Sequence, residues 1–119
     1  MQTFDLRVRL GGHEYLGRFE DNPTTRKLKS GCPWRLELAD QDRLAKFCLL
    51  EGVKLPTDAR RPEQITPGQF YLYEDNCLVL FYQPARTSYR YTYLGELLDP
   101  AKLIDYIGYH QTTLELAST

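Results

Sequence analysis

Hydrophobic and polar residues alternate along the first ten positions of the chain. In TFDLRVRL, residues 3–10, every second residue is apolar and the residues between are polar or charged. A period of two is typical of a β-strand with one side in a core and the other in solvent. Gly11-Gly12 predicts a turn. HEYLGRFE, residues 13–20, predicts a second strand in which Gly17 marks a bend or a bulge.

A short helix is predicted over residues 23–30. Asn22 is a residue type that favours the helix N-cap, a proline follows it at the first helical position, and Gly31 stands where helices end. The helix offers only Leu28 and the methyl group of Thr25 as apolar contacts. This is enough to plug the end of a larger structure but too little to form a core layer.

Two β-hairpins follow from the next patterns. PWRLELA, residues 33–39, alternates and leads through a polar turn at 40–42 into RLAKFCLL, residues 43–50. FYLY, residues 70–73, leads through the turn EDN into CLVLFY, residues 77–82. The last strand is apolar on both faces, which predicts burial on both sides and a place at the centre of the fold.

The remaining segments are a long loop, a strand, a helix and a strand. Residues 51–69 have little periodicity and several prolines, and loops of this length in small domains tend to be functional. TSYRYTYLG, residues 87–95, predicts a strand. Asp99, which a proline follows, predicts the N-cap of a second helix that Gly108 ends, and TTLEL, residues 112–116, predicts the last strand.

The tyrosine strand raises the question of which face is buried. An extended chain puts Tyr89, Tyr91 and Tyr93 on one face. Arg90 and Thr92 then lie on the other. Because an unpaired arginine inside a barrel is costlier than tyrosine hydroxyls that reach a partner at the rim, we expect the tyrosines to face inward, with Tyr91 the most buried.

The fold class follows from six to eight short strands and two short helices in a chain whose composition does not change along its length. We expect a mainly β protein, a small closed barrel with the two helices capping its ends, formed by residues 1–119 as a single domain. An open sandwich of two sheets is the alternative.

Charge and cysteine content narrow the classes of partner. Lys and Arg total 15 against 16 for Asp and Glu, so no overall field favours nucleic acid or an anionic membrane. The three cysteines are widely spaced and fit neither a disulfide framework nor a metal site. The N-terminus lacks the pattern of a signal peptide, and no window is apolar for the length of a membrane span. We therefore expect a cytoplasmic protein without metal or cofactor, although removal of a signal peptide would leave the same sequence.

The order of five motifs resembles a known family. FEDNPTTRKL, GCPWRLEL, LPTD, ITPGQFYLYEDNCLVLFY and TSYRYTYLGEL together span about residues 4–98 and resemble the bacterial cyclophilin-like domain proteins, a β-barrel family of unknown function. The resemblance implies a closed barrel with a helix at each end, akin to the fold of peptidyl-prolyl isomerases. Gln69 stands where the family often has an acidic residue, and the C-terminal helix and strand are longer than expected.

The resemblance does not identify a catalytic residue in this chain. Cyclophilins place an arginine beside the proline amide and hold the ring in a pocket of phenylalanine, tryptophan and histidine. Their Phe-His-Arg run has no counterpart here, and neither His13 nor His110 lies in a matching context. Fold alone does not carry function. We therefore expect no efficient isomerase activity.

Candidate ligand-binding residues are expected in the groove between the long loop and the strands at 70–94. The polar loop at 86–88 leads into the tyrosine strand, so hydroxyl groups and a guanidinium could converge at one end of the barrel. Packing in the barrel wall is the alternative for the tyrosines and for the tryptophan. The candidates are Tyr71, Tyr73, Tyr82, Arg86, Ser88, Tyr89 and Trp34.

Three functions remain open. The first is binding of a small ligand or an extended peptide. The second is peptidyl-prolyl isomerisation by Arg35, Arg86 or Arg90, and the third is binding of single-stranded nucleic acid on aromatic strands. The acidic pI of about 6.1 counts against nucleic acid as a partner. Acidic pairs such as Asp40 and Asp42 are interpreted as solvated turn residues, and basic residues at 26–29 and 60–61 as solubilising surface.

Overall fold

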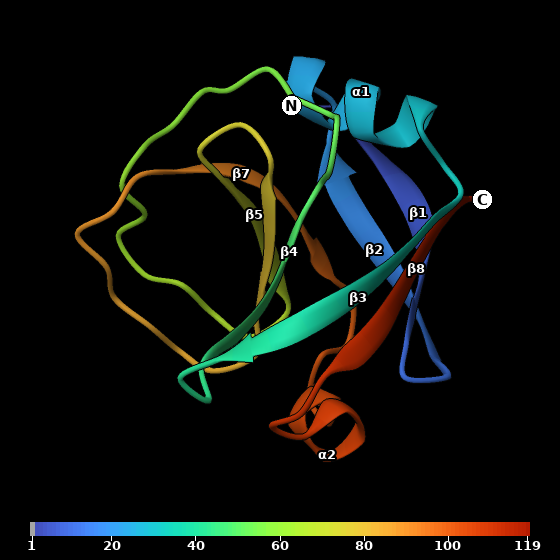
Figure 1. Cartoon of the computed structure of the whole chain (residues 1–119), viewed down its shortest axis with the longest axis vertical. Helices are drawn as coiled ribbons and strands as arrows, with labels where there is room; N and C mark the ends of the chain where they lie inside the picture. The colour runs from blue at the N-terminus through green and yellow to red at the C-terminus, as the bar shows by residue number, and fades with distance from the viewer. Residues whose placement is uncertain (1) are drawn as a thin grey trace.

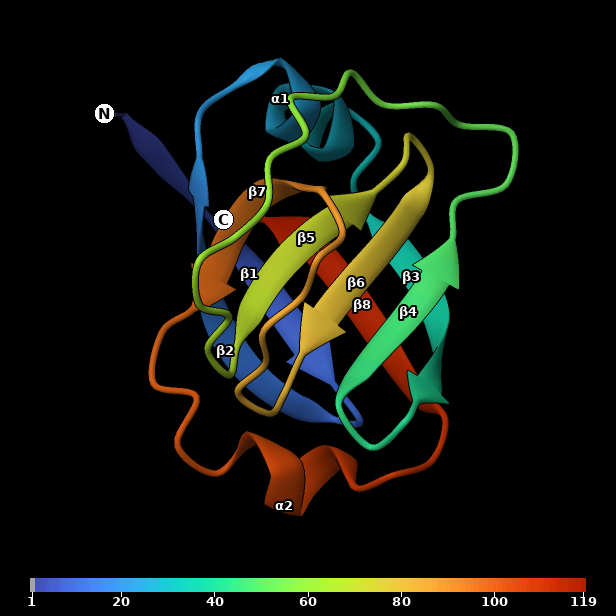
Figure 2. The ribbon, with the colours of Figure 1, turned by 90° about the vertical axis from the view of Figure 1, so that its left-hand side faces the viewer.

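In the described part of the chain, eight antiparallel strands close into a barrel in the order β1-β2-β7-β5-β6-β4-β3-β8. The computed structural model describes residues 2–119 and puts one helix at each end of the barrel (Figure 1; Figure 2). The mainly β fold class is confirmed, and the open sandwich is excluded. The elements are β1 (Thr3–Leu10), β2 (His13–Glu20), α1 (Pro23–Ser30), β3 (Trp34–Gln41), β4 (Ala45–Leu49), β5 (Gln69–Tyr73), β6 (Cys77–Phe81), β7 (Tyr91–Leu97), α2 (Leu103–Ile107) and β8 (Thr112–Ser118).

The barrel interior is a hydrophobic core built from the inward face of each strand. Leu6 on β1, Phe70 on β5 and Leu114 on β8 are all completely buried in it. The helices plug the two ends, as predicted. α1 buries Leu28 at one end, and α2 buries Ile107 at the other. The cap of α1 is also as predicted, because the Asn22 side chain accepts a hydrogen bond from the Thr25 N–H at 2.9 Å.

A second cluster of buried residues lies outside the barrel wall. We call it the outer-wall cluster. Ile65, from the segment 50–68 between β4 and β5, is completely buried in it and exchanges two main-chain hydrogen bonds with Ala85, at 3.0 and 3.1 Å. β6 is therefore buried on both faces, as its sequence predicts. The core of the cluster is Ala45, Ile65, Tyr71, Val79 and Phe81.

The prediction that the tyrosines face the barrel interior is wrong. Thr92, which lies opposite Leu72 of the core, faces inward and is only 3% exposed. Tyr91 and Tyr93 lie on the outer wall and pack against the outer-wall cluster. Tyr89 precedes β7 and is 61% exposed. Alternation fixes which residues share a face, but it cannot tell the inside from the outside when a loop covers the outside as well.

Two local predictions also need correction. Asp99 does not cap α2, because a turn follows it and the helix begins at Leu103 without a side-chain cap. Gly17 does not mark a bulge, since β1 and β2 pair in one unbroken register. The shift of register lies instead between Phe70 and Tyr71, where β5 pairs with β7. Within residues 2–119, no helix is long and apolar enough to cross a membrane.

Candidate functional site

A cavity of about 910 Å³ opens on the outer wall of the barrel, between β7 and the segment 50–68. Figure 2 shows this segment leaving β4, passing α1 and descending in front of β7. The volume lies within the usual range of small-molecule sites. We call it the outer-wall cavity. Its lining residues are Glu20, Asn22, Pro23, Thr24, Pro56, Thr57, Asp58, Arg60, Pro62, Glu63, Gln64, Gln69, Tyr71, Tyr91, Thr92 and Tyr93.

Long-range hydrogen bonds hold the loop side of the outer-wall cavity in place. The Thr24 hydroxyl of α1 donates to the Pro56 carbonyl at 2.6 Å. The Asp58 N–H donates to the Thr92 hydroxyl at 3.0 Å. Arg60 and Tyr91 exchange two main-chain hydrogen bonds, at 2.8 and 2.9 Å. The loop is thus fixed to α1 and to β7 by hydrogen bonds within the chain.

Three tyrosine side chains form the aromatic side of the cavity. The ring centre of Tyr71 is 5.6 Å from that of Tyr91 and 5.3 Å from that of Tyr93. Burial, with the nearby Glu96 carboxylate, raises the pKa of Tyr71 to about 12. Burial, with the Glu96 and Glu20 carboxylates, also raises the pKa of Tyr93. These hydroxyls are therefore neutral hydrogen-bonding groups at ordinary pH.

The charged side chains of the cavity are mostly acidic. Among the residues that the structure describes, Glu20, Asp58 and Glu63 line it together with a single cation, Arg60. The Arg60 guanidinium pairs with the Asp58 carboxylate at 3.2 Å, and both side chains are largely exposed. The cavity therefore combines aromatic rings with an excess of negative charge.

Comparison with known proteins identifies a family. The family model described as the cyclophilin-like family matches residues 8–117, which is most of the chain. The chain belongs to the cyclophilin-like family. A search of curated proteins and a search of solved structures found no match. The family resemblance predicted from the ordered motifs is thus confirmed.

The cyclophilin-like chain brings some of the predicted site residues to the outer-wall cavity and leaves others beside it. Tyr71 lines the cavity. Tyr73 lies next along the wall, with its ring centre 5.4 Å from that of Tyr91 and 6.0 Å from that of Tyr89. Tyr89 itself is exposed. The rings form a continuous series from solvent to the cavity.

The polar loop before β7 lies at the rim of the cavity. The Arg86 Nε donates to the Gln64 side chain at 3.3 Å, and Gln64 is a lining residue. Ser88 is exposed in the same loop. Arg86 is therefore adjacent to the cavity through Gln64 and does not itself line it.

Trp34 has a structural position away from the cavity. Its indole N–H donates to the Leu28 carbonyl at 2.8 Å, and its ring packs against the barrel core. Gly31 lets the ring approach, since a Cβ at that position would stand 2.5 Å from the Trp34 ring. The side chain thus fastens the end of α1 to the start of β3, which favours the packing interpretation.

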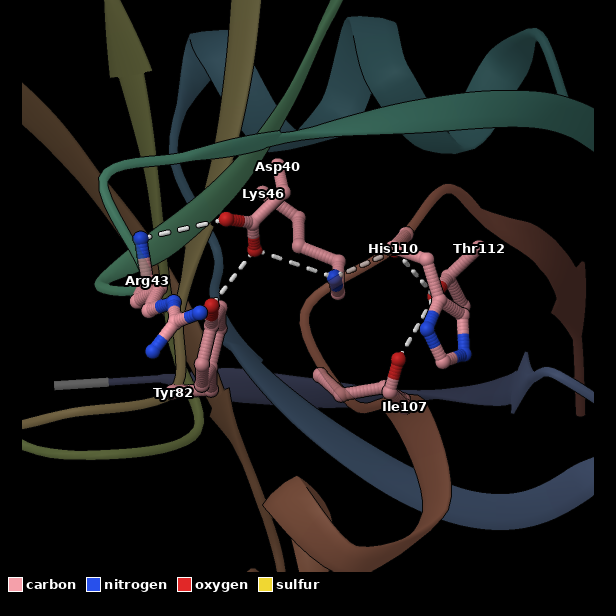
Figure 3. A network of polar contacts seen from close by, with 7 residues as sticks. All are labelled: Asp40, Arg43, Lys46, Tyr82, Ile107, His110 and Thr112. Atoms are coloured by element: carbon pink, nitrogen blue, oxygen red, sulfur yellow. Dashed lines mark hydrogen bonds and ion pairs between the residues drawn. The ribbon is translucent and has the colours of Figure 1, made fainter.

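Tyr82 belongs to a polar network in the barrel wall near α2 (Figure 3). Its hydroxyl donates to the Asp40 carboxylate. Lys46, whose side chain is completely buried, donates to the same carboxylate at 3.1 Å and to the His110 carbonyl at 2.6 Å. Tyr82 also lies under the Lys46 ammonium, which is 5.1 Å from the ring centre. The expected convergence of the Tyr82 hydroxyl with Arg86 is therefore not formed.

The interpretation of Asp40 as a solvated turn residue is wrong. Its side chain is 16% exposed, and the Arg43 N–H donates to its second oxygen at 3.1 Å. Burial alone would raise the pKa of Asp40, but the hydrogen bonds from Tyr82, Lys46 and Arg43 lower it below its ordinary value. The carboxylate thus balances a buried lysine that the sequence reasoning missed. The only signal was a lysine within an otherwise apolar strand, AKFCL.

The cysteines offer no reactive group in the described residues. Cys32, Cys48 and Cys77 are free and half-buried. Burial raises the pKa of each thiol, so the nucleophilic thiolate is disfavoured. Within residues 2–119 no group of three or more His, Cys, Asp or Glu side chains could hold a metal ion. The outer-wall cavity is therefore the best candidate site in this part of the chain.

Proposed function

We propose that this cyclophilin-like protein binds a small ligand or an extended peptide in the outer-wall cavity, without efficient isomerase catalysis. The observation that carries the proposal is the cavity itself. A loop fixed by hydrogen bonds to α1 and β7 encloses about 910 Å³ against the rings of Tyr71, Tyr91 and Tyr93. Pre-formed pockets with aromatic walls and a few polar groups are the usual form of a ligand site.

The position of the histidines supports the absence of efficient catalysis. His13 stacks on Tyr106 with ring centres 3.8 Å apart, beside α2 at the other end of the barrel. His110 lies in the connection between α2 and β8. Neither residue lines the outer-wall cavity. The cavity therefore lacks the histidine that the cyclophilin pocket uses beside the proline ring.

Titration of the isotope-labelled protein tests the binding proposal. Capped X-Pro and other short peptides, and a set of small metabolites, would be added while the amide resonances are followed by NMR. We expect saturable shifts at Tyr91, Thr92 and Tyr93 and in loop residues such as Asp58. Tyr93→Ala should weaken the same binding, whereas Tyr106→Ala, an exposed tyrosine near the other end, should not. The absence of any shift at the cavity amides would refute the proposal.

Prolyl isomerisation is the second candidate, and Arg60 is the observation that favours it. Of the three arginines proposed from sequence, Arg35 pairs with Glu115 at 3.2 Å on the outside of the barrel, and Arg86 and Arg90 are exposed. Arg60 lines the aromatic cavity. One positioned guanidinium could lower the barrier to rotation of a bound amide electrostatically.

NMR exchange spectroscopy on an X-Pro peptide decides between binding and catalysis. If the chain is an isomerase, cis/trans exchange should accelerate in proportion to protein concentration, and Arg60→Ala should abolish the effect. Arg61→Ala is the matched control, because Arg61 is exposed and does not line the cavity. Binding without any acceleration would remove this candidate and leave the first.

A further inference from the structure

The net negative charge of the outer-wall cavity narrows the class of ligand, and this inference rests on the proposed function. In the described part of the chain, the one lining cation, Arg60, already pairs with Asp58. Among residues 2–119, no basic side chain forms a salt bridge with Glu20 or Glu63. Two lining carboxylates, one at the end of β2 and one on the loop, therefore have no partner cation among the described residues. A ligand of positive charge would supply the missing partner.

The aromatic side of the cavity favours the same sign of charge. The faces of aromatic rings carry partial negative charge and attract ammonium and guanidinium groups. Tyr71, Tyr91 and Tyr93 bring three rings to one wall. Burial is the main cause of the raised pKa of Tyr93, and the Glu96 and Glu20 carboxylates raise it further, so their negative charge acts at the aromatic side of the cavity.

The N-terminus of α1, which borders the cavity, does not reverse this preference. Helix N-termini bind anions through free N–H groups of the first turn. Here Pro23 has no N–H, and the Thr25 N–H already donates to the Asn22 side chain at 2.9 Å. The Arg26 N–H is also used, since it donates to the Asn22 carbonyl at 2.9 Å. Most N–H groups that could bind a phosphate or carboxylate at this helix end are therefore already used or absent.

We propose that the outer-wall cavity recognises a cationic group, an ammonium or guanidinium, held between the carboxylates of Glu20 and Glu63 against the tyrosine rings. Two sources could carry this group: the side chain of a lysine or arginine in an extended peptide, or a free amine. Both would be attracted by the same carboxylates and rings. Anionic ligands, nucleic acid among them, would be repelled.

A set of three capped pentapeptides tests the preference. The peptides share one sequence and differ only at the central residue, which is lysine, its uncharged isostere norleucine, or glutamate. Binding is followed by NMR at the amides of Tyr91, Thr92 and Tyr93, with putrescine as the free amine. We expect the lysine peptide to bind about five- to tenfold more tightly than the norleucine peptide. Added salt should reduce the difference.

Charge-neutralising variants test whether the preference for lysine over norleucine arises in the cavity. Glu20→Gln and Glu63→Gln should each reduce the advantage of lysine over norleucine. Glu14→Gln removes the same charge near the α2 end of the barrel and should leave the advantage unchanged. Binding of putrescine as strong as that of the lysine peptide would assign the site to a free amine, and selective binding of the peptide would assign it to a protein segment.

The two proposals fail in different ways. Equal binding of lysine and norleucine peptides, or stronger binding of the glutamate peptide, would overturn the preference for cations and leave the binding function intact. If no peptide, metabolite or amine shifts the cavity amides, the binding function itself is refuted. An unchanged lysine preference in Glu20→Gln and Glu63→Gln would place the recognition outside the cavity and would also overturn this inference.

Discussion

The Lys46 ammonium donates a hydrogen bond to the Asp40 carboxylate across 3.1 Å, and the lysine side chain is completely buried. Burial of an ammonium group is costly unless a counter-charge and hydrogen bonds compensate it. The Asp40 carboxylate and the His110 carbonyl provide both. The pair thereby connects β3 and β4 to the segment between α2 and β8, which closes this end of the barrel.

Breaking this pair on one side should be strongly destabilising. We expect Lys46→Met to lower the free energy of unfolding by about 3 kcal/mol, because Asp40 then remains largely buried without its cation. In Lys46→Met/Asp40→Asn the loss should be smaller than the sum of the two single losses, by about 1 to 2 kcal/mol. Equilibrium urea unfolding of the four proteins measures the difference. Additive losses would show that the two groups do not interact.

The stability that Asp40 provides should depend on pH in the acid range. Because its pKa is lower in the folded protein than in the unfolded chain, its contribution is present above about pH 4, the ordinary value for aspartate, and is lost as pH falls through the lower folded value. The stability difference between wild type and Asp40→Asn should therefore be constant near neutral pH and shrink below about pH 4. Urea unfolding at a series of pH values measures it, and a constant difference down to acid pH would contradict the prediction.

Gly95 should not tolerate a side chain. A Cβ there would stand 2.3 Å from the Arg18 carbonyl oxygen and 2.7 Å from the Phe19 Cα, both main-chain atoms of β2. We expect Gly95→Ala to cost about 3 kcal/mol or more, since β2 and β7 would have to separate. Gly52→Ala is the comparison. Gly52 has open space and a φ of +71°, so only the backbone strain of about 1 kcal/mol applies. Equal losses would contradict the close approach.

Tyr91 should contribute to stability although it lies outside the barrel. Its ring centre is 5.6 Å from that of Tyr71 and 5.8 Å from that of Phe81, within the outer-wall cluster. We expect Tyr91→Ala to cost about 3 kcal/mol by the rule for large-to-small changes in a packed cluster. Arg90→Ala, an exposed neighbour, should cost under about 0.5 kcal/mol. Urea unfolding compares the two, and a larger loss for Arg90→Ala would be inconsistent with this packing.

Ile65 should be as important as a residue of the barrel core, although it lies in a loop. It is completely buried and bonded through its main chain to Ala85. Ile65→Ala should lower the free energy of unfolding by about 2 to 4 kcal/mol and increase hydrogen exchange in the segment 50–68. Arg61→Ala in the same loop should change neither. If Ile65→Ala leaves stability and exchange unchanged, the loop is not part of the folded core.

The sequence predicts the elements of this fold well because their signals are local. The α1 helix begins and ends where Asn22 and Gly31 predict, and strands such as β1 follow a period of two. The face of each strand that points into the barrel is harder to predict, because both faces of β6 and β7 pack against other residues. Lys46 shows the same difficulty, since a lysine on a strand is ordinarily expected in solvent.

The sequence predicts where the outer-wall cavity lies but not which loop residues line it. The length of the loop and the aromatic residues of the strands together indicate a groove between them. Arg60 and Glu63 could not be assigned to it, because the loop has no periodicity. Its position depends instead on contacts distant in sequence, such as that between Thr24 and Pro56.

The position of β8 has a consequence for how the chain reaches its fold. β8, the last of the eight strands along the chain, lies between β1 and β3, with Leu6 opposite Ser118 and Trp34 opposite Leu116. Until β8 has been synthesised, β1 and β3 each expose an unpaired edge that could pair with another nascent chain. Closure must also bring together segments from opposite ends of the barrel's sequence, and such non-local pairing slows folding. A nascent chain of this protein would therefore depend on protection of these two edges until its last strand arrives.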